Sequence, residues 1–145
     1  MKPLLVGELN TKTKAPYMAL WPPTTGTARR FCEILGITAE EYELMFDRIN
    51  LCRGEWNWQT ARLVAEILLR MSSYTQIVLF GRKVARAFGL QNFEAFSMIQ
   101  EGETRMFLLP HPSGRCRVWN DGENIKRARK LMKQVIKKEI GKDAA

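Results

Sequence analysis

The sequence predicts an α/β fold: a three-layer α/β/α sandwich around a four-stranded, mainly parallel sheet, in a single domain spanning residues 1–145. Three observations predict this fold. Several short stretches are almost wholly apolar, as are strands that are buried on both faces of a sheet. Segments with the apolar spacing of helices separate them, and this alternation is typical of parallel strands joined by helices. The length suits one hydrophobic core.

Four strands are predicted where short apolar runs end at turn residues. The first lies in KPLLVGELN and ends at Gly7; the others are DRINLC (47–52), TQIVLFG (75–81) and TRMFLLP (104–110). Between the first strand and the first helix, TKTKAPYMALWPPTTG is rich in Pro and Thr. It therefore predicts a long loop, which carries the aromatic residues Tyr17 and Trp21.

Five helices are predicted from amphipathic spacing and end signals. They are TGTARRFCEILGI (25–37), TAEEYELMF (38–46), NWQTARLVAEILLRM (57–71), RKVARAFGL (82–90) and ENIKRARKLMKQVIKKEI (123–140). Thr38 with Glu41 three residues later predicts a capping box. The other expected end signals are Thr25 or Thr27, Gly36, Gly89, and Asn120 or Asp121.

The chain carries a net charge of +8, and six of these charges belong to residues 124–145, which hold eight Lys/Arg and two Asp/Glu. A basic balance favours a polyanionic partner, most often nucleic acid. The alternative is a solvated helix face that keeps the protein soluble, and charge alone does not separate the two.

The cysteines and the single histidine give no reason to expect a cofactor. Cys32, Cys52 and Cys116 are scattered without a CxxC pair, and His111 is the only histidine. These residues cannot complete a common zinc site or a four-cysteine iron–sulfur cluster within one chain. No apolar stretch is long enough to span a membrane and no signal-peptide pattern is present, so we expect a cytoplasmic protein. We also expect a monomer without cofactor or metal.

Polar residues follow the predicted strands, and the carboxyl ends of parallel strands meet at one edge, where ligands bind. Glu8 and Asn10 follow the first strand, Asn50 lies in the second and His111 follows the last. An Asn amide offers a donor and an acceptor to the edge of a base. A neutral histidine can donate to an oxygen that gains negative charge. This set suits cleavage of an N-glycosidic bond, in which the base leaves as an anion.

The motifs resemble those of the uracil-DNA glycosylase superfamily. VGELN is similar to its first motif, and HPSGRC is similar to its second, closest to the single-strand-selective and mismatch-specific enzymes. NLC at Asn50 and IVLFGRKVARAFG also resemble family segments. The resemblance implies a DNA glycosylase that flips out uracil or a modified pyrimidine for base excision. It covers most of the chain, but Leu9 stands where the family has its water-activating residue.

The resemblance also implies roles for particular residues. His111 would stabilise the departing base anion, and Glu8 would line the pocket. The task of bringing water to the sugar suits the chemistry of Glu8 or Asn10 and does not follow from the resemblance. Base-binding roles fall to Asn50, to Trp21 or Tyr17 as a stacking ring, and to Gly7 in the pocket wall. Contacts with DNA fall to Pro112 and Ser113, and to Arg115 as the wedge in the stack. Independently of the resemblance, backbone freedom at Gly114 and positive charge at Arg117, Lys126, Arg127 and Lys130 favour further contacts with DNA phosphates. Two alternatives remain: a deglycosylase of free nucleosides or nucleotides, and a non-catalytic DNA-binding relative.

Overall fold

The computed structural model of the chain describes residues 1–9 and 18–136. Two of the residues expected to form the site, Asn10 and Tyr17, therefore lie outside the described part. The elements in chain order are β1 (Leu4–Gly7), α1 (Gly26–Leu35), α2 (Ala39–Met45), β2 (Asp47–Asn50), α3 (Trp58–Arg70), β3 (Gln76–Phe80), α4 (Arg82–Ala87), β4 (Ser97–Glu101), β5 (Thr104–Leu109), the 3-10 turn η1 (Arg117–Asn120) and α5 (Gly122–Met132).

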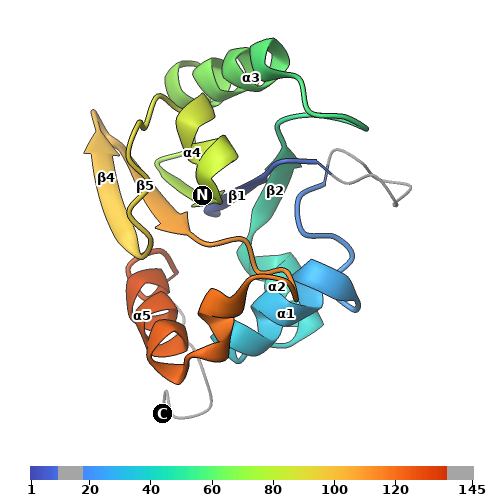
Figure 1. Cartoon of the computed structure of the whole chain (residues 1–145). Helices are drawn as coiled ribbons and strands as arrows, with labels where there is room; N and C mark the ends of the chain where they lie inside the picture. The colour runs from blue at the N-terminus through green and yellow to red at the C-terminus, as the bar shows by residue number, and fades with distance from the viewer. Residues whose placement is uncertain (10–17, 137–145) are drawn as a thin grey trace.

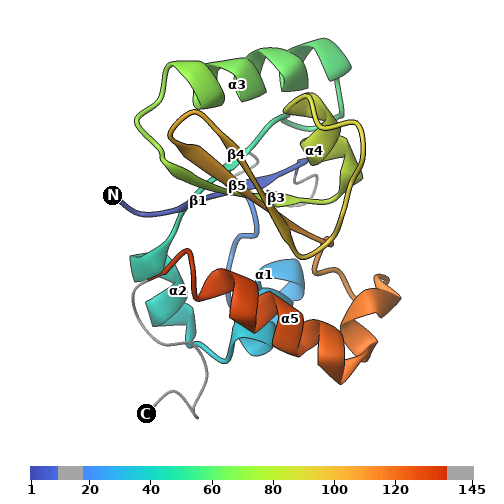
Figure 2. The ribbon, with the colours of Figure 1, turned by 90° about the vertical axis from the view of Figure 1, so that its left-hand side faces the viewer.

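The predicted three-layer α/β sandwich is confirmed (Figures 1 and 2). The sheet has the order β2-β1-β3-β5-β4, and β2, β1, β3 and β5 are parallel. Helices α3 and α4 cover one face, whereas α1, α2 and α5 cover the other, as Figure 2 shows. The carboxyl ends of four strands consequently share one edge of the sheet.

One strand was not predicted. This additional strand is β4, which pairs antiparallel with β5 through a hairpin whose turn contains Gly102 at φ 60°. The residues of β4, SMIQE, are mostly exposed or half-buried because the strand lies at the edge of the sheet. It therefore lacks the continuous apolar run that predicts a buried inner strand.

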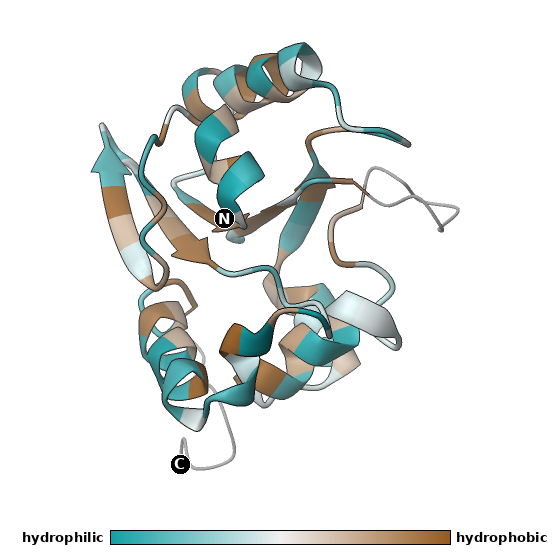
Figure 3. Cartoon of the chain, in the orientation of Figure 1, coloured by the Kyte–Doolittle hydropathy of each residue, from teal (hydrophilic) through white to brown (hydrophobic). Residues whose placement is uncertain are grey.

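Two separate cores explain why the inner strands are apolar throughout. In β1, Leu5 packs toward α1, α2 and α5, whereas Leu4 and Val6 pack toward α3 and α4. The same alternation places Val78 and Ile77 of β3 on opposite faces. Figure 3 shows β5 as largely hydrophobic and the edge strand β2 as largely hydrophilic.

Most helix-end predictions are confirmed. Thr38 and Glu41 form the capping box of α2, and Asp121 caps α5 by accepting a hydrogen bond from the Glu123 N–H. Thr25 precedes α1 but forms no side-chain capping hydrogen bond. The last helix ends at Met132, earlier than predicted, within the described residues. No helix in the described ranges is long and apolar enough to cross a membrane.

Candidate active site at the carboxyl edge of the sheet

Gly7 and Asn50 lie side by side at the ends of β1 and β2. The parallel register pairs them directly, and the Leu51 N–H donates to the Gly7 carbonyl at 3.0 Å. The Asn50 side chain is buried, with 6% of the residue exposed. A β-carbon on residue 7 would lie 2.7 Å from Asn50 Oδ1 and 3.2 Å from the Ala19 β-carbon. A side chain at residue 7 would therefore force the Asn50 amide to shift from its place against the backbone.

Glu8 extends the site from β1 toward β3. Its Oε1 lies 3.9 Å from Nζ of Lys83, and its Oε2 lies 3.8 Å from where a β-carbon on Gly81 would be. Leu9, by contrast, packs against the core beneath α3 and α4. The carboxylate available at the centre of this edge is therefore that of Glu8, and Leu9 contributes to packing.

His111 follows β5 and is held from both sides. The Gly81 N–H donates to the Leu109 carbonyl at 2.9 Å, which keeps the ends of β3 and β5 together. The indole N–H of the buried Trp119 donates to the His111 carbonyl at 3.1 Å. The backbone of the only histidine is thus fixed on the strand side and on the η1 side.

The imidazole of His111 is kept neutral by its surroundings. Burial lowers its pKa below the ordinary value, and the nearby carboxylate of Glu8 partly opposes this by favouring the charged form. Its Nδ1 is buried and has no hydrogen-bond partner in the part of the chain that the structure describes. A neutral imidazole has one N–H donor and one bare nitrogen, so it can serve as a donor at neutral pH.

The residues after His111 form a compact turn. Pro112 is buried and Ser113 is half-buried; the Ser113 carbonyl accepts a hydrogen bond from the Cys116 N–H at 3.1 Å. Gly114 and Arg115, between them, are exposed. Because this hydrogen bond joins residues three apart, it closes a tight turn at the carboxyl edge, and Arg115 is exposed on that turn.

Trp21, expected as a stacking ring, is half-buried and packs against the core on the α1, α2 and α5 side of the sheet. The Arg48 guanidinium lies over its ring, 4.9 Å from the centroid, and also lies 4.8 Å from the centroid of Tyr42. The residues that approach Gly7 are instead Ala19 and Leu20. No pattern in the sequence marked these two small and aliphatic residues as part of the site.

The basic residues of α5 are spread along the helix. Arg127 lies over the Phe96 ring at 4.5 Å, and Nζ of Lys126 lies 3.4 Å from the Glu123 carboxylate. Farther along, Gln134 accepts hydrogen bonds from side chains at the amino ends of β3 and β5, namely Gln76 and Arg105. The chain therefore leads from Arg127, beside Phe96, to the amino edge of the sheet, where Gln134 follows the end of the helix.

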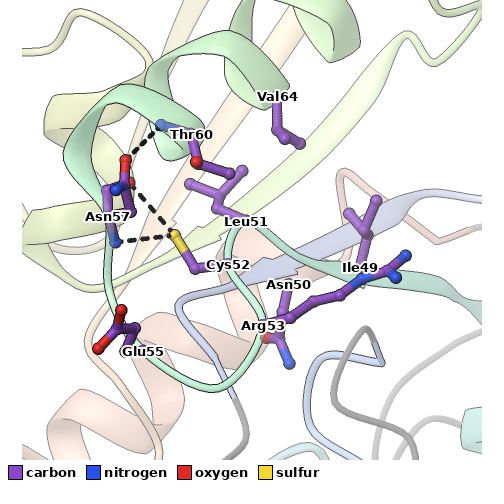
Figure 4. A pocket seen from close by; sticks show the side chains of 9 residues that line it. All are labelled: Ile49, Asn50, Leu51, Cys52, Arg53, Glu55, Asn57, Thr60 and Val64. Atoms are coloured by element: carbon purple, nitrogen blue, oxygen red, sulfur yellow. Dashed lines mark hydrogen bonds between the residues drawn. The ribbon is translucent and has the colours of Figure 1, made fainter.

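A cavity of about 360 Å³ lies beside the carboxyl end of β2 (Figure 4). Cys52 Sγ bridges the N–H and the carbonyl of Asn57, both at 3.4 Å, and Asn57 Oδ1 accepts from the Thr60 N–H. Figure 4 shows the Asn50 side chain pointing away from Cys52 and Asn57. Asn50 is one of the residues that line this cavity, and its wall also contains Arg53, Asn57 and Thr60, which the sequence did not single out.

Among the described residues, no group of three or more His, Cys, Asp or Glu side chains is arranged to hold a metal ion. The three cysteines are free thiols, and burial raises the pKa of Cys32 to about 11. No protein-family model matches the chain, and no curated protein matches it.

Proposed function

We propose that this protein is a monofunctional DNA base glycosylase, which hydrolyses the N-glycosidic bond of uracil or a modified pyrimidine after the base is flipped out of the DNA. The observation that carries the proposal is the shared position of three groups at one sheet edge: the Asn50 amide beside Gly7, the Glu8 carboxylate and the partly buried, neutral imidazole of His111. Each has the chemistry that one part of the reaction needs.

The role of His111 is to stabilise the departing base. A buried acceptor without a partner is tolerated more readily than a buried N–H without one, so the bare nitrogen is assigned to Nδ1 and the proton to Nε2. Nε2–H then donates to the base oxygen on which negative charge develops. A donor that is already aimed at a developing charge stabilises the transition state without reorganisation.

Glu8 acts as the general base that activates water. The water oxygen forms a bond to C1′ of the sugar while the C1′–N bond breaks. The electron pair of the C1′–N bond leaves with the nucleobase. The Glu8 carboxylate accepts the proton that the attacking water loses, and that proton afterwards neutralises the base anion. Glu8 and His111 follow strands that end at the same edge of the sheet, and the charge of Glu8 partly opposes the lowering of the imidazole pKa; both support this assignment.

Asn50 selects the base. Because its amide carries both a donor and an acceptor, it can pair with a carbonyl and a ring N–H of a pyrimidine at once. Its burial supports this role, since a buried amide left without partners by the wrong base costs about 1–3 kcal/mol.

The turn after His111 is assigned to DNA. Flipping a base costs a few kcal/mol, and a side chain that enters the vacated stack offsets part of this cost. Arg115 is exposed at the tip of the turn, and Ser113 and Gly114 beside it allow hydrogen bonding and close approach to phosphates.

The proposal is tested by incubating the protein with oligonucleotides that each carry one altered base, followed by alkaline cleavage of abasic sites. We expect strand breaks at uracil or at one modified pyrimidine. His111→Ala should lower the single-turnover rate on the order of 100–1000-fold while DNA binding persists. Cleavage of free nucleosides but not of DNA would favour a nucleoside deglycosylase, and DNA binding without cleavage of any base would favour a non-catalytic relative.

A further inference from the structure

Four side chains from four separate segments form a series along the carboxyl edge. The ring of Trp56, before α3, lies 5.5 Å from Nζ of Lys83, at the start of α4. Lys83 in turn lies 3.9 Å from the Glu8 carboxylate, and Glu8 acts electrostatically on His111. We propose that Lys83 is a positioning residue for the reaction: it holds the Glu8 carboxylate between the ends of β1 and β3, where the attacking water must lose its proton. This inference rests on the proposed glycosylase activity.

Glu8 needs such a partner because it follows the last residue of β1. Its side chain is 29% exposed, and in the described part of the chain Lys83 is the only cation that forms an ion pair with it. Glutamate has several rotatable bonds, so an unrestrained carboxylate would occupy many positions. A base must lie within hydrogen-bond reach of the proton it accepts.

Lys83 is itself held at a defined point. Gly81, which precedes α4, has a φ of 90°, and its N–H bonds to the end of β5. This turn fixes where α4 begins, and Lys83 is its second residue. A cation in the first turn of a helix is disfavoured by the helix dipole, so this lysine is poorly suited to stabilising α4. Its contacts with Glu8 and with the Trp56 ring give it a different role.

The simpler interpretation is that Lys83 contacts a DNA phosphate and that its pair with Glu8 is incidental. The ammonium group is well exposed, and exposed ion pairs contribute little stability. The two interpretations differ in one respect. A phosphate contact acts independently of Glu8, whereas a positioning residue has no effect once the carboxylate is gone.

The test is a double-mutant cycle with Lys83→Gln, Glu8→Gln and the double variant, measured as single-turnover rates on the cleaved oligonucleotide at saturating protein. We expect Lys83→Gln to slow the wild-type protein on the order of 10–100-fold, as misplacement of a reacting group does. It should change the rate of the Glu8→Gln protein by less than about twofold. Lys83→Arg should restore part of the rate. Arg86→Gln, an exposed change on the same helix, is the matched control and should leave the rate unchanged.

Equal slowing by Lys83→Gln in both backgrounds would overturn the proposal in favour of a phosphate contact. A second arm needs no substrate: the ¹³C carboxyl resonance of Glu8, assigned by its absence in Glu8→Gln, should shift in Lys83→Gln and not in Arg86→Gln. An unmoved resonance would overturn the positioning role whatever the activity. If the resonance moves but the wild-type protein cleaves no base, the Lys83–Glu8 contact stands and the glycosylase proposal fails.

Discussion

Asn50 Oδ1 lies so close to the backbone of Gly7 that a β-carbon on residue 7 would come within 2.7 Å of it. Gly7→Ala should therefore displace the amide and destabilise the protein by about 1–3 kcal/mol, the usual cost of overpacking. Denaturant unfolding measures this cost. Gly122→Ala is the matched control, because a β-carbon there meets nothing within 4 Å. Equal stability of Gly7→Ala and wild type would show that Asn50 can move at no cost.

Asn50 should determine which base is cleaved. Asn50→Asp replaces the amide donor with an acceptor while keeping the shape of the side chain. The ranking of rates across oligonucleotides with different bases should then change, with discrimination altered by about 1–3 kcal/mol. An unchanged ranking with uniformly lower rates would remove Asn50 from base recognition and leave it a structural role.

Stability should fall as the pH drops below neutrality because of His111. Burial lowers its pKa in the folded protein from the ordinary value of 6.5, so the unfolded chain binds the proton first. The unfolding free energy consequently decreases as the pH falls from about 6.5 toward the folded-state pKa, by at most about 1.4 kcal/mol per pH unit. His111→Gln should remove this contribution. Urea unfolding of both proteins between about pH 7.5 and 5 measures the difference, and parallel curves would contradict the expectation.

Arg115 should matter more for duplex DNA than for single strands. Only a duplex has a stack that closes behind the flipped base, so Arg115→Ala should slow cleavage of double-stranded substrates more. Arg117→Ala is the comparison, because Arg117 is also exposed but lies in η1. Equal slowing of both kinds of substrate by Arg115→Ala would make Arg115 a phosphate contact only.

The basic residues of α5 should strengthen DNA binding whatever the DNA sequence. Replacing Lys126, Arg127 and Lys130 with Gln should weaken binding to every sequence and reduce the log–log salt slope by about 0.9 for each DNA phosphate that the variant no longer neutralises. Since Arg127 lies over Phe96, its replacement alone should also disturb packing, which thermal unfolding would detect. A salt slope that does not change would mean that this helix faces away from the DNA.

The inner part of the fold could be predicted from sequence because buried parallel strands are apolar on both faces. The runs ending at Gly7 and Pro110, and the capping box of Thr38 and Glu41, were sufficient to locate their elements. Strand β4 could not be found this way, because it is a half-exposed edge strand whose place depends on pairing with β5.

The candidate site was predicted in part. Asn50 lies beside Gly7 at one edge of the sheet and His111 follows β5 at that edge, as expected from the strand ends. The burial of the His111 imidazole was not predicted. The contacts of Ala19 with Gly7 and of Trp21 with Arg48 depend on how a loop folds back over the sheet. Loop paths are set by tertiary contacts, so local sequence patterns carry little information about them.

The position of β1 between β2 and β3 has a consequence for synthesis on the ribosome. β1 is made before the other strands of this sheet, yet one of its two neighbours, β3, ends only at Phe80, so a nascent chain that stops before β3 leaves one edge of β1 unpaired. An apolar strand with an open edge readily pairs with other chains. Fragments that stop before β3 should therefore aggregate, whereas chains that extend beyond β5 can close the parallel part of the sheet.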